Sequence, residues 1–124
     1  MAAVGAITLT EQVTGTVKKV TFAWTSDAAG IVSGIPTTAF FSGAIDRLVT
    51  VPSGGGTAPT ALYDIVINDD DGTDVLMGSG ANRSATATEQ VLASSLGYMA
   101  NSKLTLGITN AGASKQGTIY LYIR

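Results

Sequence analysis

The stretch Lys103–Arg124, KLTLGITNAGASKQGTIYLYIR, decides the fold class. Both of its halves alternate large apolar residues with smaller or more polar ones. The apolar positions are Leu104, Leu106 and Ile108 in the first half, and Ile119, Leu121 and Ile123 in the second. A period of two places these side chains on one face of an extended chain, as a half-buried β-strand requires. The connecting residues NAGASKQG are typical of turns, so the stretch predicts two strands joined by a loop.

The same alternation occurs earlier in the chain. In KKVTFAWTS, Val20, Phe22 and Trp24 fall on one face of a predicted strand. A second strand, AIDRLVTVP, alternates two sets of residues and stops at Pro52, and the loop that follows contains Gly54–Gly56. The N-terminal residues are expected to form a first strand or an arm that docks on a neighbour.

Two further segments are expected on either side of an acidic turn. Tyr63, Ile65 and Ile67 share one face of a predicted strand, and Val75 and Met77 continue the pattern beyond the turn, so the two pieces are expected to form a hairpin. The only helix candidate is ATATEQVLASSLGYM, in which Thr88 is a possible N-cap. Small and β-branched residues make a loop with one turn an equal alternative there.

Short strands separated by Gly, Ser, Asn and Pro turns predict an all-β fold. We expect an antiparallel β-sandwich, jelly-roll-like, with at most one short helix. An up-and-down barrel is the competing architecture. The length of 124 residues fits a single domain, residues 1–124.

Composition excludes several classes of function. The chain has no Cys and no His, so neither a Ser-His-Asp triad nor a His- or Cys-ligated zinc site is available. Charged residues make up only 13% and the net charge is −2, which disfavours nucleic acid binding. The N-terminal MAAVGAITLTEQ has no basic region and is too short to span a bilayer, so we expect neither a secretion signal nor a membrane contact.

The stretch Val66–Val75, VINDDDGTDV, contains four of the nine carboxylates and is a candidate cation site. When Gly72 is set at position six of an EF-hand loop, Asp69 and Asp71 fall correctly, but Ile67 and Gly78 occupy the two anchoring positions. A hairpin tip explains the stretch better, because Asp-Gly favours tight turns with positive φ. Whether the Asp69–Asp74 turn binds a cation stays open.

A pair of carboxylates could still hydrolyse a glycoside. Asp46, Asp64 and Glu89 are scattered singly along the chain, and no phosphate-binding loop is complete. We therefore expect no enzyme, and no catalytic, cofactor-binding or metal-ligating residues.

Several aromatic residues do not fit a simple core. Phe40 and Phe41 are adjacent, so one of the two is expected outside the core. Tyr120 and Tyr122 alternate with the apolar residues of the last strand, which makes both of its faces apolar or amphipathic. Together with the low charge, this pattern predicts outer faces that other subunits partly cover.

The segments VKKVTFAWTSDAAG, DRLVTVP, YDIVINDDDGTDVL and KLTLGITNAGASKQGTIYLYIR, in this order, resemble small β-rich virion structural proteins of tailed bacteriophages. The resemblance covers most of the chain but includes no catalytic signature. It implies a capsid decoration (cement) protein, assembled in the bacterial host cytoplasm, that binds the major capsid protein or other virion subunits as a homo-oligomer. A neck or tail component is the alternative. A calcium-assisted carbohydrate-binding or adhesin module using Asp69, Asp71 and Asp74 is a further one.

Overall fold

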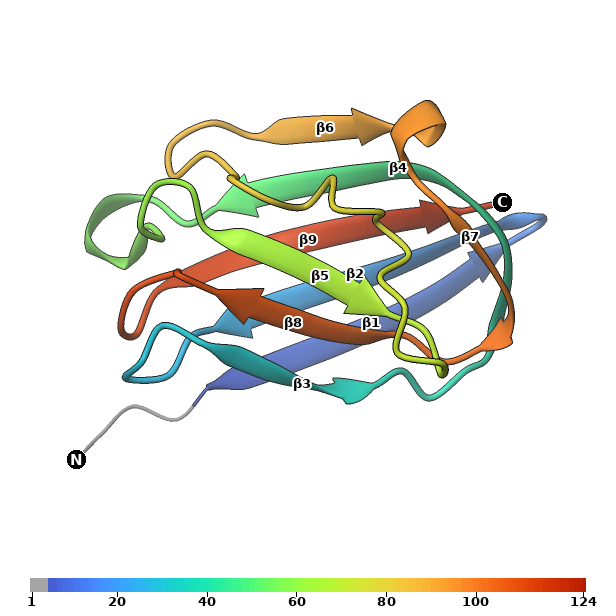
Figure 1. Cartoon of the computed structure of the whole chain (residues 1–124), viewed down its shortest axis with the longest axis horizontal. Coiled ribbons are helices and arrows are strands. Elements are labelled where there is room, and N and C mark those ends of the chain that lie inside the picture. Colours follow the sequence, from blue (N-terminus) through green and yellow to red (C-terminus); the bar gives the residue numbers. More distant parts are fainter. Residues whose placement is uncertain (1–4) are drawn as a thin grey trace.

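The structure, a computed structural model, describes residues 5–124 and consists of nine strands joined by turns (Figure 1). The strands are β1 (Ala6–Thr14), β2 (Val17–Thr25), β3 (Val32–Pro36), β4 (Phe41–Pro52), β5 (Asp64–Asn68), β6 (Glu89–Leu92), β7 (Tyr98–Ser102), β8 (Thr105–Thr109) and β9 (Gln116–Ile123). Two single 3-10 turns, η1 (Gly55–Thr57) and η2 (Ala93–Ser95), interrupt the loops. No α-helix is present among these residues, and none of their segments is a helix long and apolar enough to cross a membrane.

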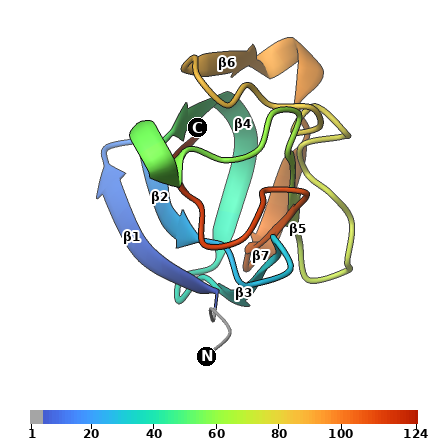
Figure 2. The same cartoon turned by 90° about the vertical axis from the view of Figure 1, so that its left-hand side faces the viewer.

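The strands form two antiparallel sheets. The large sheet has the order β1-β2-β9-β4-β6 and curls into a half-barrel, with β7 pairing with the beginning of β4. The small sheet has the order β3-β8-β5 and lies across the large one, as Figures 1 and 2 show from two directions. The prediction of an all-β fold with antiparallel sheets is therefore confirmed.

A single core fills the space between the sheets, and the predicted strand faces supply it. Buried side chains of the large sheet include Val20, Phe22, Trp24, Ile119, Leu121 and Ile123, and those of the small sheet include Ile65, Ile67, Leu106 and Ile108. Leu104, just before β8, is also buried. The period-two interpretation of these strands is thus correct in every case. Hydrophobic burial on this scale is the main force that stabilises a domain of this size.

The two sheets are linked by an aromatic contact. The ring centroids of Trp24, on β2, and Tyr63, which precedes β5, lie 5.6 Å apart at an angle of 46°. The indole of Trp24 extends across β9 at Gly117, its register partner in the sheet. A Cβ placed on Gly117 would lie 2.7 Å from Trp24 Cζ2, so glycine is required at this position.

The adjacent phenylalanines separate as expected. Phe41 begins β4 and is 2% exposed, whereas Phe40 is 56% exposed and contacts the ammonium group of Lys103, whose Nζ lies 5.2 Å from the ring centroid. On the same strand the inward residues are Leu48 and Thr50, and Val49 and Val51 point outward.

The predicted hairpin beyond the acidic turn is wrong in its second half. An isolated bridge joins Asn68 to Asp74, and the Val75 N–H donates to Ile67 O at 2.8 Å, but no strand follows. Instead the chain turns repeatedly, and Met77 adopts a φ of 53°. Val75 is buried and Met77 is exposed, so they do not share a face.

The window around Thr88 forms neither the helix nor the loop with one turn. It forms β6, the turn η2 and the beginning of β7. The physical reason is pairing: Gln90 and Leu92 lie opposite Val49 and Arg47 of β4, while Val91 packs against the core. At the other end of the chain, the first strand is confirmed as β1, while residues 2–4 of the suggested arm lie outside the described residues.

The contact of Gly117 with Trp24 generates the first prediction. The variant Gly117→Ala should lower the free energy of unfolding by about 2 kcal/mol, because a rigid indole cannot yield to the new methyl group. The measurement is urea denaturation followed by tryptophan fluorescence. Gly54→Ala is the matched control, since Gly54 has φ −90° and nothing within 4 Å of an added Cβ. Equal stabilities of the two variants would contradict this packing.

Tyr63 generates the second prediction. Burial raises the pKa of Tyr63 to about 12. The unfolded tyrosine ionises near its ordinary pKa of 10.0, so the unfolded state gains an advantage that grows as pH rises from 10 toward 12. The free energy of unfolding should therefore fall by up to about 3 kcal/mol over this range.

The variant Tyr63→Phe removes the ionisable group while keeping the ring. Its stability relative to the original chain should increase between about pH 8 and pH 11, because only the original chain carries the alkaline penalty. Urea denaturation at both pH values measures the difference. A difference independent of pH would contradict the raised pKa.

Candidate functional site

The acidic turn, residues 69–74, follows β5 and is held by its own side chains. The Asp69 N–H donates to Thr73 O at 3.0 Å, and Gly72 takes a φ of 80°. One carboxylate oxygen of Asp69 accepts hydrogen bonds from the N–H groups of Asp71 and Thr73, both at 3.0 Å. A tight turn at Asp71-Gly72 is therefore present, and Asp69 stabilises it by bonding within the loop.

Asp74 stabilises the next part of the chain. Its Oδ1 accepts from the N–H groups of Ile67 at 3.1 Å and Leu76 at 3.0 Å, and its Oδ2 accepts from Gly78 at 3.0 Å. These bonds draw the chain into consecutive turns along the edge of β5. Asp74 is thus the physical reason why the expected second strand of the hairpin does not form.

The turn does not gather its carboxylates around a common point. Among residues 5–124 no three acidic side chains form a group that could hold a metal ion. Asp70 bonds in another direction: its N–H donates to Ser102 Oγ at 2.9 Å, and its Oδ2 accepts from the Lys103 N–H at 3.1 Å. The geometry therefore gives no support to a calcium site built from Asp69, Asp71 and Asp74.

The three carboxylates considered for a glycosidase have separate surroundings. Asp46 is exposed at a bulge of β4. Asp64 accepts a hydrogen bond from the side-chain amide of Asn110 at 2.7 Å, and Glu89 forms an ion pair with Arg83 at 3.7 Å. The Asp64 and Glu89 carboxylates are thus engaged in bonds that stabilise the fold.

The feature that the strand pairing does create is the outer face of the large sheet, the side turned away from the core. Register partners in an antiparallel sheet share a face, so the pairings of five strands define its members. They are Ala6, Thr8, Thr10, Gln12 and Thr14 on β1, Val17, Lys19, Thr21, Ala23 and Thr25 on β2, Gln116, Thr118, Tyr120 and Tyr122 on β9, Arg47, Val49 and Val51 on β4, and Gln90 and Leu92 on β6.

Two cations and two tyrosines meet at the centre of this face, and we call Lys19, Arg47, Tyr120 and Tyr122 the cationic tyrosine patch. Lys19 Nζ lies 4.6 Å from the ring centroid of Tyr120 and 5.6 Å from that of Tyr122. Arg47 Cζ lies 4.6 Å from the Tyr122 centroid. Cation–π contacts of this kind hold the charged groups over the rings and stiffen the surface.

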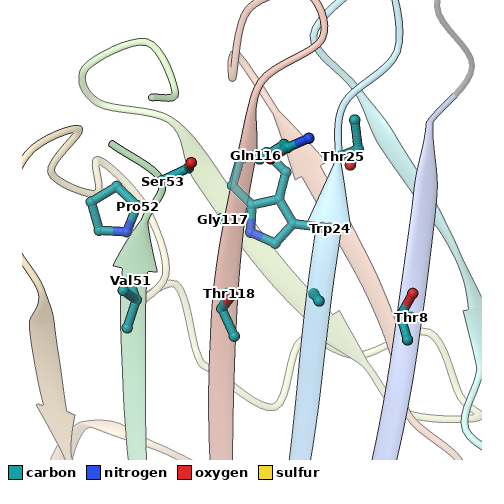
Figure 3. A pocket seen from close by; sticks show the side chains of 10 residues that line it. Thr8, Trp24, Thr25, Val51, Pro52, Ser53, Gln116, Gly117 and Thr118 are labelled. Carbon is teal, nitrogen blue, oxygen red and sulfur yellow. The ribbon is translucent and has the colours of Figure 1, made fainter. Parts of the chain in front are cut away.

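A shallow groove of about 360 Å³ lies on the same face, beside the patch along β2, β9 and β4 (Figure 3). Its lining includes the methyl group of Ala23 and the hydroxyl and amide groups of Thr8, Thr118 and Gln116. None of its lining residues is charged. The groove thus adds neutral hydrogen-bonding groups to a surface whose charge comes from the patch.

Charge is distributed unevenly between the two sheets. Among the register-paired outward residues of the large sheet that the structure describes, Lys19 and Arg47 are charged and none is a carboxylate. The exposed carboxylate of Asp46 belongs to the β4 bulge, next to Arg47 in the chain. The acidic turn belongs to the small sheet. Within residues 5–124 the only ion pair is Arg83–Glu89, so neither the patch nor the acidic turn is neutralised inside the molecule.

Comparison of the chain with protein-family models, with curated proteins and with solved structures finds no match. Its function is therefore inferred from its own residues and surfaces.

The sequence indicated part of this surface. Alternation identified Tyr120 and Tyr122 as residues turned away from the core, which is correct. It did not identify Lys19 and Arg47, which are 28 positions apart in the chain. The pairing of both strands with β9 brings them to the two sides of Tyr122, and this neighbourhood becomes visible only when the register is known.

The bonds of Asp74 generate a prediction that separates a structural turn from a metal site. Asp74→Ala should lower the free energy of unfolding by about 2 kcal/mol, because three backbone N–H groups lose their acceptor. Asp71→Ala, the matched control in the same turn, should change stability little, since the Asp71 carboxylate accepts no hydrogen bond from a described residue. Urea denaturation with and without millimolar calcium measures both. Stabilisation by calcium that is lost in Asp71→Ala would instead favour a cation site.

Proposed function

We propose that the chain is a non-enzymatic virion structural protein, most specifically a capsid decoration protein that stabilises a phage head through contacts with its own copies and with the major capsid protein. The observation that carries the proposal is the outer face of the large sheet. Strands β2, β9 and β4 fill the core with one side and present tyrosines, valines and stiffened cations on the other. Surfaces enriched in tyrosine and arginine and poor in carboxylates are typical of protein–protein interfaces.

Exposed apolar side chains beside this face add support. Leu92, at the β6 edge, is 66% exposed, and Tyr98, on β7, is 79% exposed. Contact with another subunit would remove this apolar surface from water, at a gain of roughly 25 cal/mol per Å². The edge near β6 and β7 is therefore the part of the molecule from which we expect contact with the capsid to extend.

The opposite edge of the large sheet is also open. Among the described residues, β1 pairs along its length only with β2. Its Glu11 carboxylate accepts hydrogen bonds from the N–H groups of Thr38 and Ala39 at 2.9 and 2.8 Å. An edge strand offers unpaired backbone groups to a neighbouring chain. A neighbour's strand at β1 would extend the large sheet from one subunit to the next.

The assignment to a phage virion rests on the resemblance of the segment order, and the surfaces are consistent with it. We assign the curled two-sheet arrangement to the jelly-roll-like sandwiches on the same ground. A neck or tail component would use the same surfaces and is the alternative. The carbohydrate-binding alternative loses its support, because the oxygens of Asp69 and Asp74 bond to the backbone of their own turn.

Purified particles that contain the chain test the proposal. Cryo-EM should locate it on the outside of the head, with copies on the order of hundreds, as a subunit bound to every capsid position requires. About six or twelve copies at one vertex would identify a neck or tail component instead. Absence from the particles would refute both assignments.

The variant Leu92→Ser adds a residue-level test. When this variant is added to particles that lack the chain, fewer copies should bind than with the original chain. The reason is that Leu92 contributes exposed apolar surface at the proposed contact edge. Val66→Ser is the matched control, since Val66 is also partly exposed but lies on the outer face of the small sheet. Quantitative gel analysis of sedimented particles measures occupancy. A larger loss with Val66→Ser would place the contact on the small sheet.

A further inference from the structure

We propose that the cationic tyrosine patch of one copy binds the acidic turn of a second copy, so that the chain associates head to tail through two different surfaces. This inference deepens the proposed function, because it specifies the contact between copies on which homo-oligomeric assembly would depend. It rests on four observations: the positive charge of the patch, the negative charge of the acidic turn, the positions of the two surfaces on opposite sides of the core, and the neutral hydroxyl groups beside the patch.

The patch holds positive charge that the molecule does not neutralise. Lys19 Nζ lies over two tyrosine rings and forms no ion pair with a described residue, and Arg47 donates a hydrogen bond from Nη1 to Gln90 Oε1 at 3.3 Å. Both are half-buried, so their stems are already ordered by the rings beneath them. A binding partner therefore pays little additional entropy to meet two fixed cations.

The acidic turn holds negative charge in a similarly fixed form. Its backbone is ordered by the bonds of Asp69 and Asp74, whereas Asp70 and Asp71 are exposed. Asp71 accepts no hydrogen bond from a described residue, and Asp70 uses one of its two oxygens. The turn thus presents carboxylate oxygens on a rigid loop, which is the form of anion that suits two cations held on a sheet.

The two surfaces cannot meet within one molecule. The patch lies on the side of the large sheet away from the core, and the turn follows β5 of the small sheet, on the other side of the core. Figure 2 shows β1 and β2 on one side of the molecule and β5 on the other. Complementary charge on opposite sides of a chain favours a contact between copies that uses a different surface on each, which closes into a ring or continues as a row.

The neutral groups around the patch also suit carboxylates. Thr21 is the next outward residue on β2 after Lys19, and Thr118 is the next on β9 before Tyr120. Hydroxyl groups donate hydrogen bonds to carboxylate oxygens that the two cations do not reach. None of the register-paired outward residues of this sheet is a carboxylate, and the one exposed carboxylate of β4, Asp46, lies at the bulge beside Arg47.

The test measures self-association of the full chain by sedimentation velocity over a range of protein concentrations. The association constant should fall by about tenfold when the salt concentration is raised from low to physiological, because screening reduces the attraction between exposed charges. The face variant Lys19→Glu/Arg47→Glu and the turn variant Asp70→Lys/Asp71→Lys should each lose association. Lys115→Glu is the control for charge change alone, since Lys115 Nζ bonds to Gly56 O away from both surfaces, and it should retain association.

Mixing the two variants gives the decisive measurement. The negative face of one attracts the positive turn of the other, and the reverse pair attracts as well, so the mixture should associate although neither variant does so alone. Circular dichroism establishes that each variant is folded. A folded chain that stays monomeric at every salt and concentration would overturn the inference, as would association that survives both variants or a mixture that stays monomeric.

These outcomes are distinct from failure of the proposed function. A chain that is monomeric in solution yet occupies the head of the particle would retain the decoration role and lose this contact. A chain that associates through the patch but is absent from particles would retain the contact and lose the role.

Discussion

The fold depends on β9, which pairs with a strand at each edge, packs into the core with one face and presents the tyrosines of the patch on the other. Its two edges are hydrogen-bonded to β2 and β4, and its inward residues Ile119, Leu121 and Ile123 are completely buried. Its outward residues include the tyrosines of the cationic tyrosine patch. A strand in this position tolerates little change, and Gly117 shows the tightest restriction, because the Trp24 indole occupies the space of a side chain. The core and the candidate interaction surface are therefore two sides of the same strand.

Much of the fold could be predicted from alternation alone. Every strand face that the pattern indicated in β2, β5, β8 and β9 is buried. When large apolar residues occupy every second position, only one face of the strand can turn toward the core. The prediction failed where a side chain bonds to the backbone. Val75 and Met77 alternate like strand residues, yet the Asp74 carboxylate binds the N–H groups of Leu76 and Gly78 and folds the chain back.

The candidate site was less accessible to prediction, because it depends on register. The sequence identified Tyr120 and Tyr122 as aromatic residues outside the core face of their strand, but their cationic neighbours come from β2 and β4. A pairing shifted by one residue would direct Lys19 into the core and leave Tyr122 without its partner. The β6 strand illustrates the same limit: its sequence is compatible with a helix, and the available edge of β4 determines that it forms a strand.

The acidic turn acquires a different meaning in the structure. A group of carboxylates in sequence suggests a cation, but two of the four act mainly as acceptors for backbone N–H groups that the tight turns leave without partners. This use fixes the loop and leaves its charge uncompensated. A rigid, charged loop is a recognition element in its own right, because its shape is set before a partner arrives.

The strand order has a consequence for how the chain reaches its native state. β2 and β4 do not pair with each other, and the large sheet exists only when β9 has entered between them. β9 follows all the other described strands in the sequence. The edges of β2 and β4 that pair with β9 therefore stay unpaired until β9 has been synthesised. Contacts between residues so far apart in sequence make folding slow, and the intermediate is open to pairing with other chains. Any association of the chain through the large sheet would therefore have to follow the pairing of β9 with β2 and β4.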